Sequence, residues 1–313
     1  MASASGAAAG RPPNTTTHIF VVGLPRTGST LTRGILNASP HVWIAGESHF
    51  FPEPTRLGLT RREGYAARFR RLGDLATDEG VGRVLDEIFS LRGKSFWARL
   101  ATVVDRPTFE AELRRSDRTD RALLDTAMAV FARGRPIRGE KTPHHIHSVP
   151  TLLEWFPGAR IIHTFRDPRA VYVSLRRKER AEKLTTLGLA ARRLGPVFDL
   201  YATANVIRRW RTMVRLHHAY AARFPDRYTL VRFEDLVTEP GATATRLSDF
   251  LGIEYTDEML EQVVHNSSFM SKGTGSGIDA TTIDRWRDHL SPTARSWFAR
   301  RCAAELLELG YAA

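Results

Sequence analysis

The chain has 313 residues, of which 42% are hydrophobic, and it carries a formal net charge of +12 with a single cysteine. This length is sufficient for one large domain or two small ones with a buried core. The lone Cys302 excludes a disulfide framework and a cysteine-based metal site, and no apolar run approaches the ~18 residues that a membrane-spanning helix requires.

The positive charge favours an anionic partner, such as nucleic acid, acidic lipid or a phosphorylated small molecule. Only five of the 46 basic residues are lysine, and the arginines are spread over the whole chain. Nucleic-acid-binding proteins tend instead to concentrate basic residues in stripes with interleaved aromatic residues. We therefore expect no nucleic-acid partner, and a basic nucleic-acid-binding module is an alternative that only the net charge supports.

Residues 1–17 consist mostly of Ala, Ser, Gly, Pro and Thr. They have neither the basic n-region nor the apolar h-region of a signal peptide. The composition predicts a disordered leader and a cytoplasmic protein.

The most informative stretch is residues 18–31, His-Ile-Phe-Val-Val-Gly-Leu-Pro-Arg-Thr-Gly-Ser-Thr-Leu. The apolar run 19–22 predicts a buried parallel strand, and residues from Ser29 onward are compatible with a helix. A strand, a glycine-bearing loop and a helix N-terminus form a cradle for an anion. The alternative is a glycine turn between a core strand and a core helix.

The loop matches the spacing of the nucleotide-binding P-loop at Gly23, Gly28 and Thr30, but Ser29 stands where the P-loop has its lysine. Without that lysine, a loop cannot hold the transferred phosphoryl group of ATP in the usual way. Arg26 supplies the nearest positive charge. A P-loop nucleotide kinase or NTPase is therefore an alternative that Ser29 disfavours, and the loop indicates a different phosphate ester.

The rest of the chain alternates strands and helices. A second strand leads into a loop at Glu47, and a helical insertion over residues 55–135 has helix-like segments near 63–72, 78–90 and 119–133. A short strand ends at Lys141, and Pro143 opens a helix. Residues 159–165 form a buried strand, followed by Asp167 as helix N-cap and Pro168 as first helical residue.

Long helices are predicted over 186–223 with a break at Gly195-Pro196. A last strand is expected over 227–233, a helical section ending at Gly252, a glycine-rich loop at 266–278 and a helix over about 292–310. This pattern predicts an α/β fold, a P-loop-type parallel sheet flanked by helices, with residues 18–313 as a single domain.

Ligands are expected at the carboxyl ends of parallel strands. Four features fall there: the loop 23–30, Glu47, Lys141, and Arg166 with Ser174 eight residues later. The Arg166 guanidinium and the Ser174 hydroxyl can share one phosphate. The alternatives are a surface ion pair of Arg166 with Asp167 or a neighbouring carboxylate, an exposed Ser174, a capping role for Glu47 and a Lys141–Glu140 surface pair.

Two phosphate sites without a magnesium ligand indicate 3′-phosphoadenosine 5′-phosphosulfate (PAPS), the sulfuryl donor. The sequence resembles the P-loop sulfotransferases, particularly the carbohydrate, tyrosylprotein and bacterial members. The resemblance covers residues 18 to about 310. It rests on Gly-Leu-Pro-Arg-Thr-Gly-Ser-Thr at 23–30 and Arg-Asp-Pro-Arg-Ala-Val-Tyr-Val-Ser-Leu at 166–175, with weaker matches at Gly-Glu-Lys-Thr-Pro 139–143, Val-Arg-Phe-Glu-Asp-Leu 231–236 and Asp-Arg-Trp 284–286.

The resemblance implies roles residue by residue. The 5′-phosphosulfate would be held by Arg26, Thr27, Gly28, Ser29 and Thr30. The 3′-phosphate would be held by Arg166 and Ser174, with Lys272 and Gly273 in a late basic-glycine segment. Phe233 would lie beside the adenine, where many members have a tyrosine.

For catalysis, Glu47 matches the glutamate base of one branch, and His49 is the reserve candidate. We hypothesise that Glu47 removes the proton of the acceptor hydroxyl, while Lys141 and Arg26 stabilise the transferring group and the leaving oxygen. No metal is expected, and the helical spacing of His144, His145 and His147 fans them around the axis. The acceptor would be a sugar, a phenol or a small natural product; the sequence indicates neither which one nor the oligomeric state.

Overall fold

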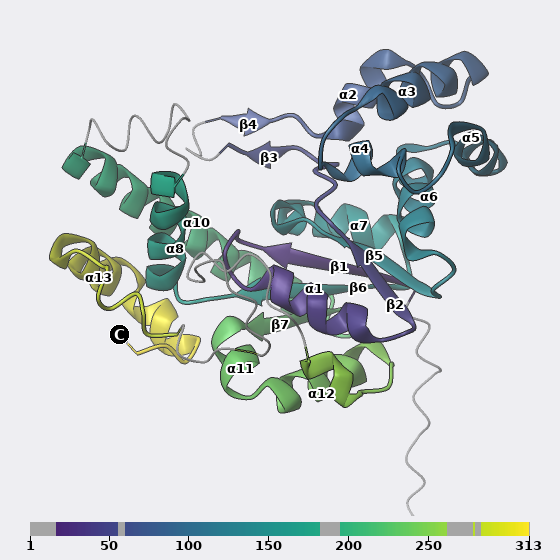
Figure 1. The fold of residues 1–313 in the computed structure, drawn as a ribbon. Coiled ribbons are helices and arrows are strands. Elements are labelled where there is room, and N and C mark those ends of the chain that lie inside the picture. The colour runs from purple at the N-terminus through teal and green to yellow at the C-terminus, as the bar shows by residue number, and fades with distance from the viewer. Residues whose placement is uncertain (1–16, 56–59, 182–194, 262–277, 279–282, 313) are drawn as a thin grey trace, which may run out of the picture.

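A computed structural model of the protein describes residues 17–55, 60–181, 195–261, 278 and 283–312. Its centre is a five-stranded sheet in the order β2-β5-β1-β6-β7, in which every neighbouring pair is parallel (Figure 1). The strands are β1 (His18–Gly23), β2 (Val42–Ala45), β5 (Ile137–Lys141), β6 (Ala159–Phe165) and β7 (Tyr228–Arg232). This architecture confirms the predicted parallel α/β fold.

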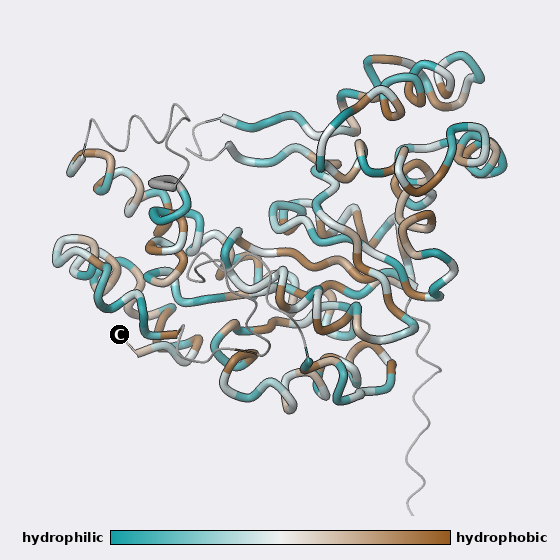
Figure 2. The backbone as a smooth tube through the Cα atoms, viewed as in Figure 1, coloured by the Kyte–Doolittle hydropathy of each residue, from teal (hydrophilic) through white to brown (hydrophobic). Residues whose placement is uncertain are grey.

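The central strand β1 is buried on both faces, so its alternate side chains serve two different cores. Ile19 and Val21 belong to a cluster with residues of α1 (Ser29–Ala38), α11 (Phe233–Thr238) and α12 (Pro240–Leu251). Phe20 and Val22 belong to the larger cluster on the opposite face. Figure 2 shows the resulting concentration of hydrophobic residues along the central strands.

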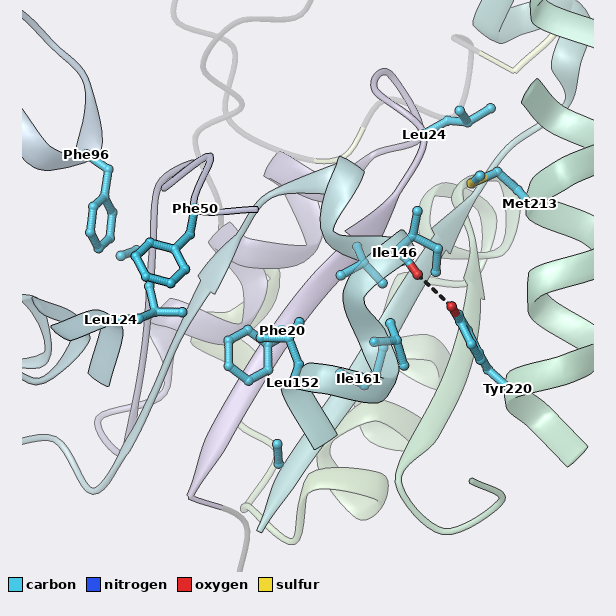
Figure 3. Packing of buried hydrophobic residues seen from close by; sticks show 14 of the residues in the cluster. Phe20, Leu24, Phe50, Phe96, Leu124, Ile146, Leu152, Ile161, Met213 and Tyr220 are labelled. Atoms are coloured by element: carbon cyan, nitrogen blue, oxygen red, sulfur yellow. Dashed lines mark hydrogen bonds between the residues drawn. The ribbon is translucent and has the colours of Figure 1, made fainter. Parts of the chain in front are cut away.

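The larger cluster joins the sheet to α7 (Val149–Trp155), to α10 (Gly195–Arg223) and to the insertion. Figure 3 shows Phe20, Leu152 and Ile161 packed together and Phe50 beside Leu124 of the insertion. The hydroxyl of Tyr220 on α10 donates a hydrogen bond to the carbonyl oxygen of Ile146 over 3.0 Å (Figure 3). This bond fixes α10 to the segment that follows β5.

The predicted insertion consists of a short hairpin, β3 (Glu53–Pro54) and β4 (Arg61–Arg62), followed by helices. The helices α2 (Tyr65–Leu72), α3 (Asp78–Ser90) and α6 (Asp120–Ala132) confirm three predicted segments. The hairpin, α4 (Phe96–Leu100) and α5 (Arg106–Arg115) were not predicted. In Figure 1 the helices gather at one end of the sheet, and the hairpin extends from them toward α8 (Pro168–Ala181) and α10.

Two further details differ from the sequence-based expectation. Pro143 opens a 3-10 helix, η1 (Pro143–Ser148), and not an α-helix, which begins only at Val149. The helical section before Gly252 is two helices, because Glu239 has a non-helical backbone between α11 and α12. The chain continues through η2 (Asp257–Leu260) and ends in α13 (Pro292–Glu308).

Within the part of the chain that the structure describes, no helix is both long and apolar enough to cross a lipid bilayer.

Candidate active site

The loop between β1 and α1 has a backbone shape that depends on glycine. Gly28 has φ +89° and is the N-cap of α1, and a Cβ atom placed there would lie 2.6 Å from Cδ2 of Phe233. Within the described chain no side chain caps α1, and its first turn contains no acidic residue. The N–H groups at this helix end are therefore available to an anion.

Thr27 supports the loop from inside. Its side chain is 2% exposed, and its hydroxyl donates to the Leu24 carbonyl over 2.7 Å and lies 2.7 Å from the Thr164 hydroxyl. The hydroxyl of Thr27 thus ties the loop to β6, where Thr164 lies.

Arg26 connects the loop to the other predicted phosphate-binding motif. Its Nε donates to Oγ of Ser174 over 2.8 Å, and Nη1 of Arg166 donates to the Arg26 carbonyl over 3.4 Å. Arg26 itself has a left-handed backbone, with φ +77°. The loop, Arg166 and Ser174 therefore form one continuous cluster.

Arg166 follows the last residue of β6 and is 7% exposed. Its guanidinium carbon lies 3.9 Å from the centre of the Phe233 ring, a cation–π geometry. The Trp210 indole donates to the Arg166 carbonyl over 3.0 Å, which anchors this strand end to α10. Burial lowers the pKa of Arg166 to about 10, so it remains a cation at neutral pH.

Arg166 is buried, so the alternative of a surface ion pair at this residue is wrong. The carboxylate of Asp167 pairs with Arg169, and its Oδ1 accepts the Arg169 N–H over 2.8 Å at the start of α8. The predicted N-cap position of Asp167 and first helical position of Pro168 are confirmed. Ser174 is 1% exposed, so it is not an ordinary surface serine.

Glu47 lies between two basic side chains. Its Oε1 is in contact with Nζ of Lys141, and its Oε2 lies 3.4 Å from Nε2 of His49. On the other ring nitrogen, His49 lies 2.7 Å from Oε1 of the buried Glu53. Burial disfavours the charged imidazole of His49, but the hydrogen bond to Glu53 and the charges of both glutamates outweigh burial and raise its pKa.

The alternative pairing of Lys141 with Glu140 is wrong, because adjacent strand residues point to opposite faces. Glu140 is fully buried, and its Oε1 lies 2.6 Å from Nδ1 of His145. Burial opposes ionisation of Glu140, but the attraction of His145 outweighs it and lowers the pKa of the carboxyl. Lys141 instead contacts Glu47.

The histidines at 144, 145 and 147 have different surroundings. Nε2 of His145 accepts the Phe51 N–H over 3.3 Å, so both of its nitrogens are engaged. Nε2 of His144 lies 3.4 Å from Nη2 of Arg209, and burial together with the Arg209 charge lowers the pKa of His144 to about 4. Among the described residues, no group of three or more His, Cys, Asp or Glu side chains is arranged to hold a metal ion.

A cavity of about 540 Å³ adjoins these groups. Of the predicted site residues, Arg26, Ser29, Thr30, Glu47 and Lys141 line it, and so does the reserve base candidate His49. Arg166, Ser174 and Phe233 lie behind Arg26 and Gly28, within contact of the loop. Lys272 and Gly273 lie outside the described residues.

We call this cavity the main cavity. Its opposite wall contains residues that the sequence analysis did not predict as site residues. They come from the hairpin, from η1 and from α10, and they include Glu53, Arg62, His144, Tyr201, Asn205 and Arg209. No motif marks these positions, since a long helix and a short hairpin meet there only in the folded chain.

Comparison with known proteins gives this arrangement its context. A family model described as "Sulfotransferase family" matches residues 18–257. The chain belongs to the sulfotransferase family. The sulfotransferase domain of the Synechococcus olefin synthase superposes on it with a TM-score of 0.54 at 20% identity, covering 94% of this chain and 97% of that domain.

Curated relatives of this sulfotransferase-family protein include two named branches. Zebrafish protein-tyrosine sulfotransferase 1 is 24% identical over 280 residues, which cover 87% of this chain and 61% of the relative. Human carbohydrate sulfotransferase 5 is 34% identical over 178 residues, 52% of this chain and 42% of the relative. An uncharacterized Aquifex aeolicus protein is 26% identical over 274 residues, which cover 86% of this chain but only 30% of the relative.

Proposed function

We propose that this sulfotransferase-family protein transfers the sulfuryl group of PAPS to a hydroxyl of an acceptor and releases adenosine 3′,5′-bisphosphate. The observation that carries the proposal is the Arg26–Ser174 contact. It joins an anion cradle to a second cationic cluster at Arg166, beside a cavity that contains the Glu47–Lys141 pair. A donor with phosphate at both ends of its ribose needs two such neighbouring sites.

The residues present fit this donor. The uncapped N-terminus of α1, with Ser29 and Thr30 on the cavity wall, would receive the 5′-phosphosulfate. Arg166 and Ser174 would receive the 3′-phosphate, because a buried guanidinium and a hydroxyl bind phosphate through charge-assisted hydrogen bonds. The ring of Phe233, stacked on Arg166, offers an apolar face to the adenine.

In the proposed reaction the acceptor oxygen forms a bond to sulfur as the bond from sulfur to the phosphate oxygen breaks. Glu47 takes the proton of the acceptor hydroxyl, a step that typically contributes ~10²–10⁴-fold. Lys141 and Arg26 stabilise the negative charge on the leaving oxygen, where one donor is commonly worth ~3 kcal/mol. Since these cations supply the charge, we expect no metal requirement.

Lys141 would have two successive partners in this reaction. Before reaction it contacts Glu47, and this contact orients the carboxylate toward the cavity. As Glu47 accepts the proton its attraction for Lys141 weakens, and the ammonium group becomes available to the charge that develops on the leaving oxygen.

The donor is tested by calorimetry with adenosine 3′,5′-bisphosphate, ATP with magnesium, and an oligonucleotide. We expect binding of the bisphosphate only, and a dissociation constant at least tenfold higher in Arg166→Ala (~1.4 kcal/mol). Arg115→Ala is the control, because Arg115 is exposed on α5 and pairs with Glu112. Preference for ATP with magnesium would indicate the kinase alternative, and salt-dependent oligonucleotide binding would indicate the nucleic-acid module.

The acceptor class is tested by transfer of labelled sulfate from PAPS to a panel of sugars, phenols and small natural products. Relatives named for protein tyrosine and for carbohydrate justify including tyrosine peptides and glycans. We expect labelled product from at least one class, and release of bisphosphate without any labelled acceptor would contradict transfer to a hydroxyl.

A single domain over residues 18–313 and a cytoplasmic location stay predictions.

A further inference from the structure

A second cavity, of about 400 Å³, lies on the far side of the wall that bounds the main cavity. Pro54, His144 and Arg209 line both cavities, so the two adjoin. The second cavity is lined by residues of the hairpin β3–β4, of α10 and of η1, and Figure 1 shows the hairpin extending toward α10. None of the residues to which a role has been assigned above lines it.

The polar lining of the second cavity is basic. Arg61 comes from β4, Arg208 and Arg209 come from α10, and His144 and His147 come from η1. No Asp or Glu is among its lining residues, all of which lie in the described part of the chain. The remaining lining residues are Leu24, Pro54, Thr60, Thr212 and Met213.

Some arginines elsewhere in the insertion pair with acidic neighbours. Arg114 and Arg118 both pair with Asp78, and Arg71 pairs with Glu63. Around the second cavity, Arg61 donates to the Pro52 carbonyl and Arg209 contacts His144. Glu53, on the side of the main cavity, lies 3.9 Å from His144 but does not line the second cavity. The side chains that line the second cavity therefore include cations and no carboxylate.

The two histidines of this lining have lowered pKa values, mainly because they are buried. Burial, followed by the charge of Arg209, lowers the pKa of His144 to about 4. Burial, followed by the charges of Arg61 and Arg209, lowers the pKa of His147. Both imidazoles are thus neutral at pH 7 and can donate or accept hydrogen bonds without adding charge.

The floor of the second cavity is apolar and fixed. Figure 3 shows Leu24 beside Met213, above Ile146, whose carbonyl is held by Tyr220. Leu24 is the residue directly after β1, so the floor of the second cavity is continuous with the loop of the proposed donor site.

We propose that the second cavity is an anion-binding subsite for the acceptor, which carries a carboxylate, phosphate or sulfate group at a distance from the hydroxyl that is sulfated. The acceptor would span the shared wall, with its hydroxyl at Glu47 and its anionic group among Arg61, Arg208 and Arg209. The proposal deepens the proposed function and rests on it. Guanidinium groups suit this task because they bind planar or tetrahedral oxyanions through paired hydrogen bonds.

The site is tested by titrating inorganic phosphate into the protein saturated with adenosine 3′,5′-bisphosphate, followed by calorimetry. The double variant Arg61→Gln/Arg208→Gln changes only residues that line the second cavity alone. We expect the dissociation constant for phosphate to rise at least tenfold and the constant for the bisphosphate to stay unchanged. The matched control is Arg115→Gln/Arg300→Gln, which removes the same charge from exposed positions on α5 and α13.

Absence of phosphate binding to the saturated protein, or an equal constant in the double variant, would overturn the subsite. Failure of the bisphosphate itself to bind would instead overturn the proposed function, and the phosphate titration of the double variant would still report on the cavity. The role in acceptor selection is tested with paired acceptors, such as 4-hydroxyphenylacetate and its methyl ester. Equal use of both members by the parent enzyme would contradict that role.

Discussion

The Nε atom of Arg26 donates a hydrogen bond to Oγ of Ser174 over 2.8 Å, and this bond joins the loop after β1 to the second turn of α8. The two residues come from the two motifs that the resemblance assigns to opposite ends of the donor. Their contact places the two proposed phosphate sites side by side. It also means that each residue is held in place by the other before any ligand arrives.

Ser174→Ala should weaken binding of adenosine 3′,5′-bisphosphate by roughly 10–100-fold, since a hydrogen bond to a charged group contributes ~1.5–3 kcal/mol. The side chain is buried, so the fold is checked by circular dichroism and the dissociation constant by calorimetry. Ser90→Ala is the control, because Ser90 is exposed at the end of α3, where its hydroxyl donates to the Glu87 carbonyl. An unchanged constant in Ser174→Ala would remove Ser174 from the donor site.

Glu47→Gln should lower kcat by ~10²–10⁴ without changing the dissociation constant for the bisphosphate. The reason is that glutamine keeps the shape of the side chain but cannot accept the hydroxyl proton. Single-turnover transfer of labelled sulfate measures the chemical step.

His49→Gln distinguishes the two base candidates. His49 lies 3.4 Å from Glu47 and 2.7 Å from Glu53, so we expect it to position Glu47 and not to accept the proton itself. We therefore expect His49→Gln to lower kcat by a smaller factor than Glu47→Gln does. A larger decrease of kcat in His49→Gln than in Glu47→Gln would make His49 the base.

Much of the fold could be predicted because local patterns determine it. The alternation of Ile19 and Val21 with Phe20 and Val22 serves two cores, and such a run is recognisable as a doubly buried strand. Asp167 and Pro168 marked the start of α8 for the same reason: capping is a property of adjacent residues. Residues 159–165 were predicted as a strand with the bounds that β6 shows.

The sequence indicates that the acceptor contacts the insertion and the helices after residue 185, but the individual residues on the acceptor side could not be predicted, because their positions depend on tertiary contacts. Glu53 and Arg209 are 156 positions apart, and both line the main cavity only because the hairpin packs near α10. The hairpin strands are two residues long, too short for a periodic pattern. The pairing of Lys141 with Glu47 depended likewise on which face of β5 turns toward the loop after β2.

Acid should destabilise the protein through His163, which is fully buried with Nδ1 2.6 Å from the Tyr228 hydroxyl. Burial lowers the pKa of His163 to about 3. Below about pH 6.5, His163 therefore binds a proton in the unfolded chain but not in the folded chain. The contribution of neutral His163 to the free energy of unfolding is fully present above pH 6.5 and is lost as the pH falls toward 3. By pH 5 this loss amounts to about 2 kcal/mol.

Urea unfolding at pH 7.5 and pH 5.0 measures this loss. The variant His163→Gln cannot titrate, so its free energy of unfolding should fall less between the two pH values than that of the parent. His144, whose pKa is also lowered to about 4, should leave part of the dependence in place. His41→Gln is the control, because His41 is exposed before β2. Parallel losses in the parent and in His163→Gln would contradict the assignment.

Gly28→Ala should destabilise the loop for two separable reasons. A left-handed φ of +89° costs a non-glycine residue ~1–3 kcal/mol, and the new Cβ would lie 2.6 Å from Cδ2 of Phe233. Gly93→Ala separates the two, because Gly93 has φ +109° and nothing lies within 4 Å of the position that its new methyl group would take, so only the backbone cost applies there.

A double-mutant cycle with Phe233→Ala then isolates the steric term. Removing the ring gives the Gly28→Ala methyl room, so the double variant should be more stable than the sum of the single changes predicts, by at least ~0.5 kcal/mol. Gly93→Ala combined with Phe233→Ala should be additive, since the two sites share no contact. Because Phe233 also stacks on Arg166 at 3.9 Å, displacement of its ring in Gly28→Ala should weaken bisphosphate binding as well. Additivity in both cycles would show that Phe233 moves aside without cost and that Gly28 is required for its backbone conformation alone.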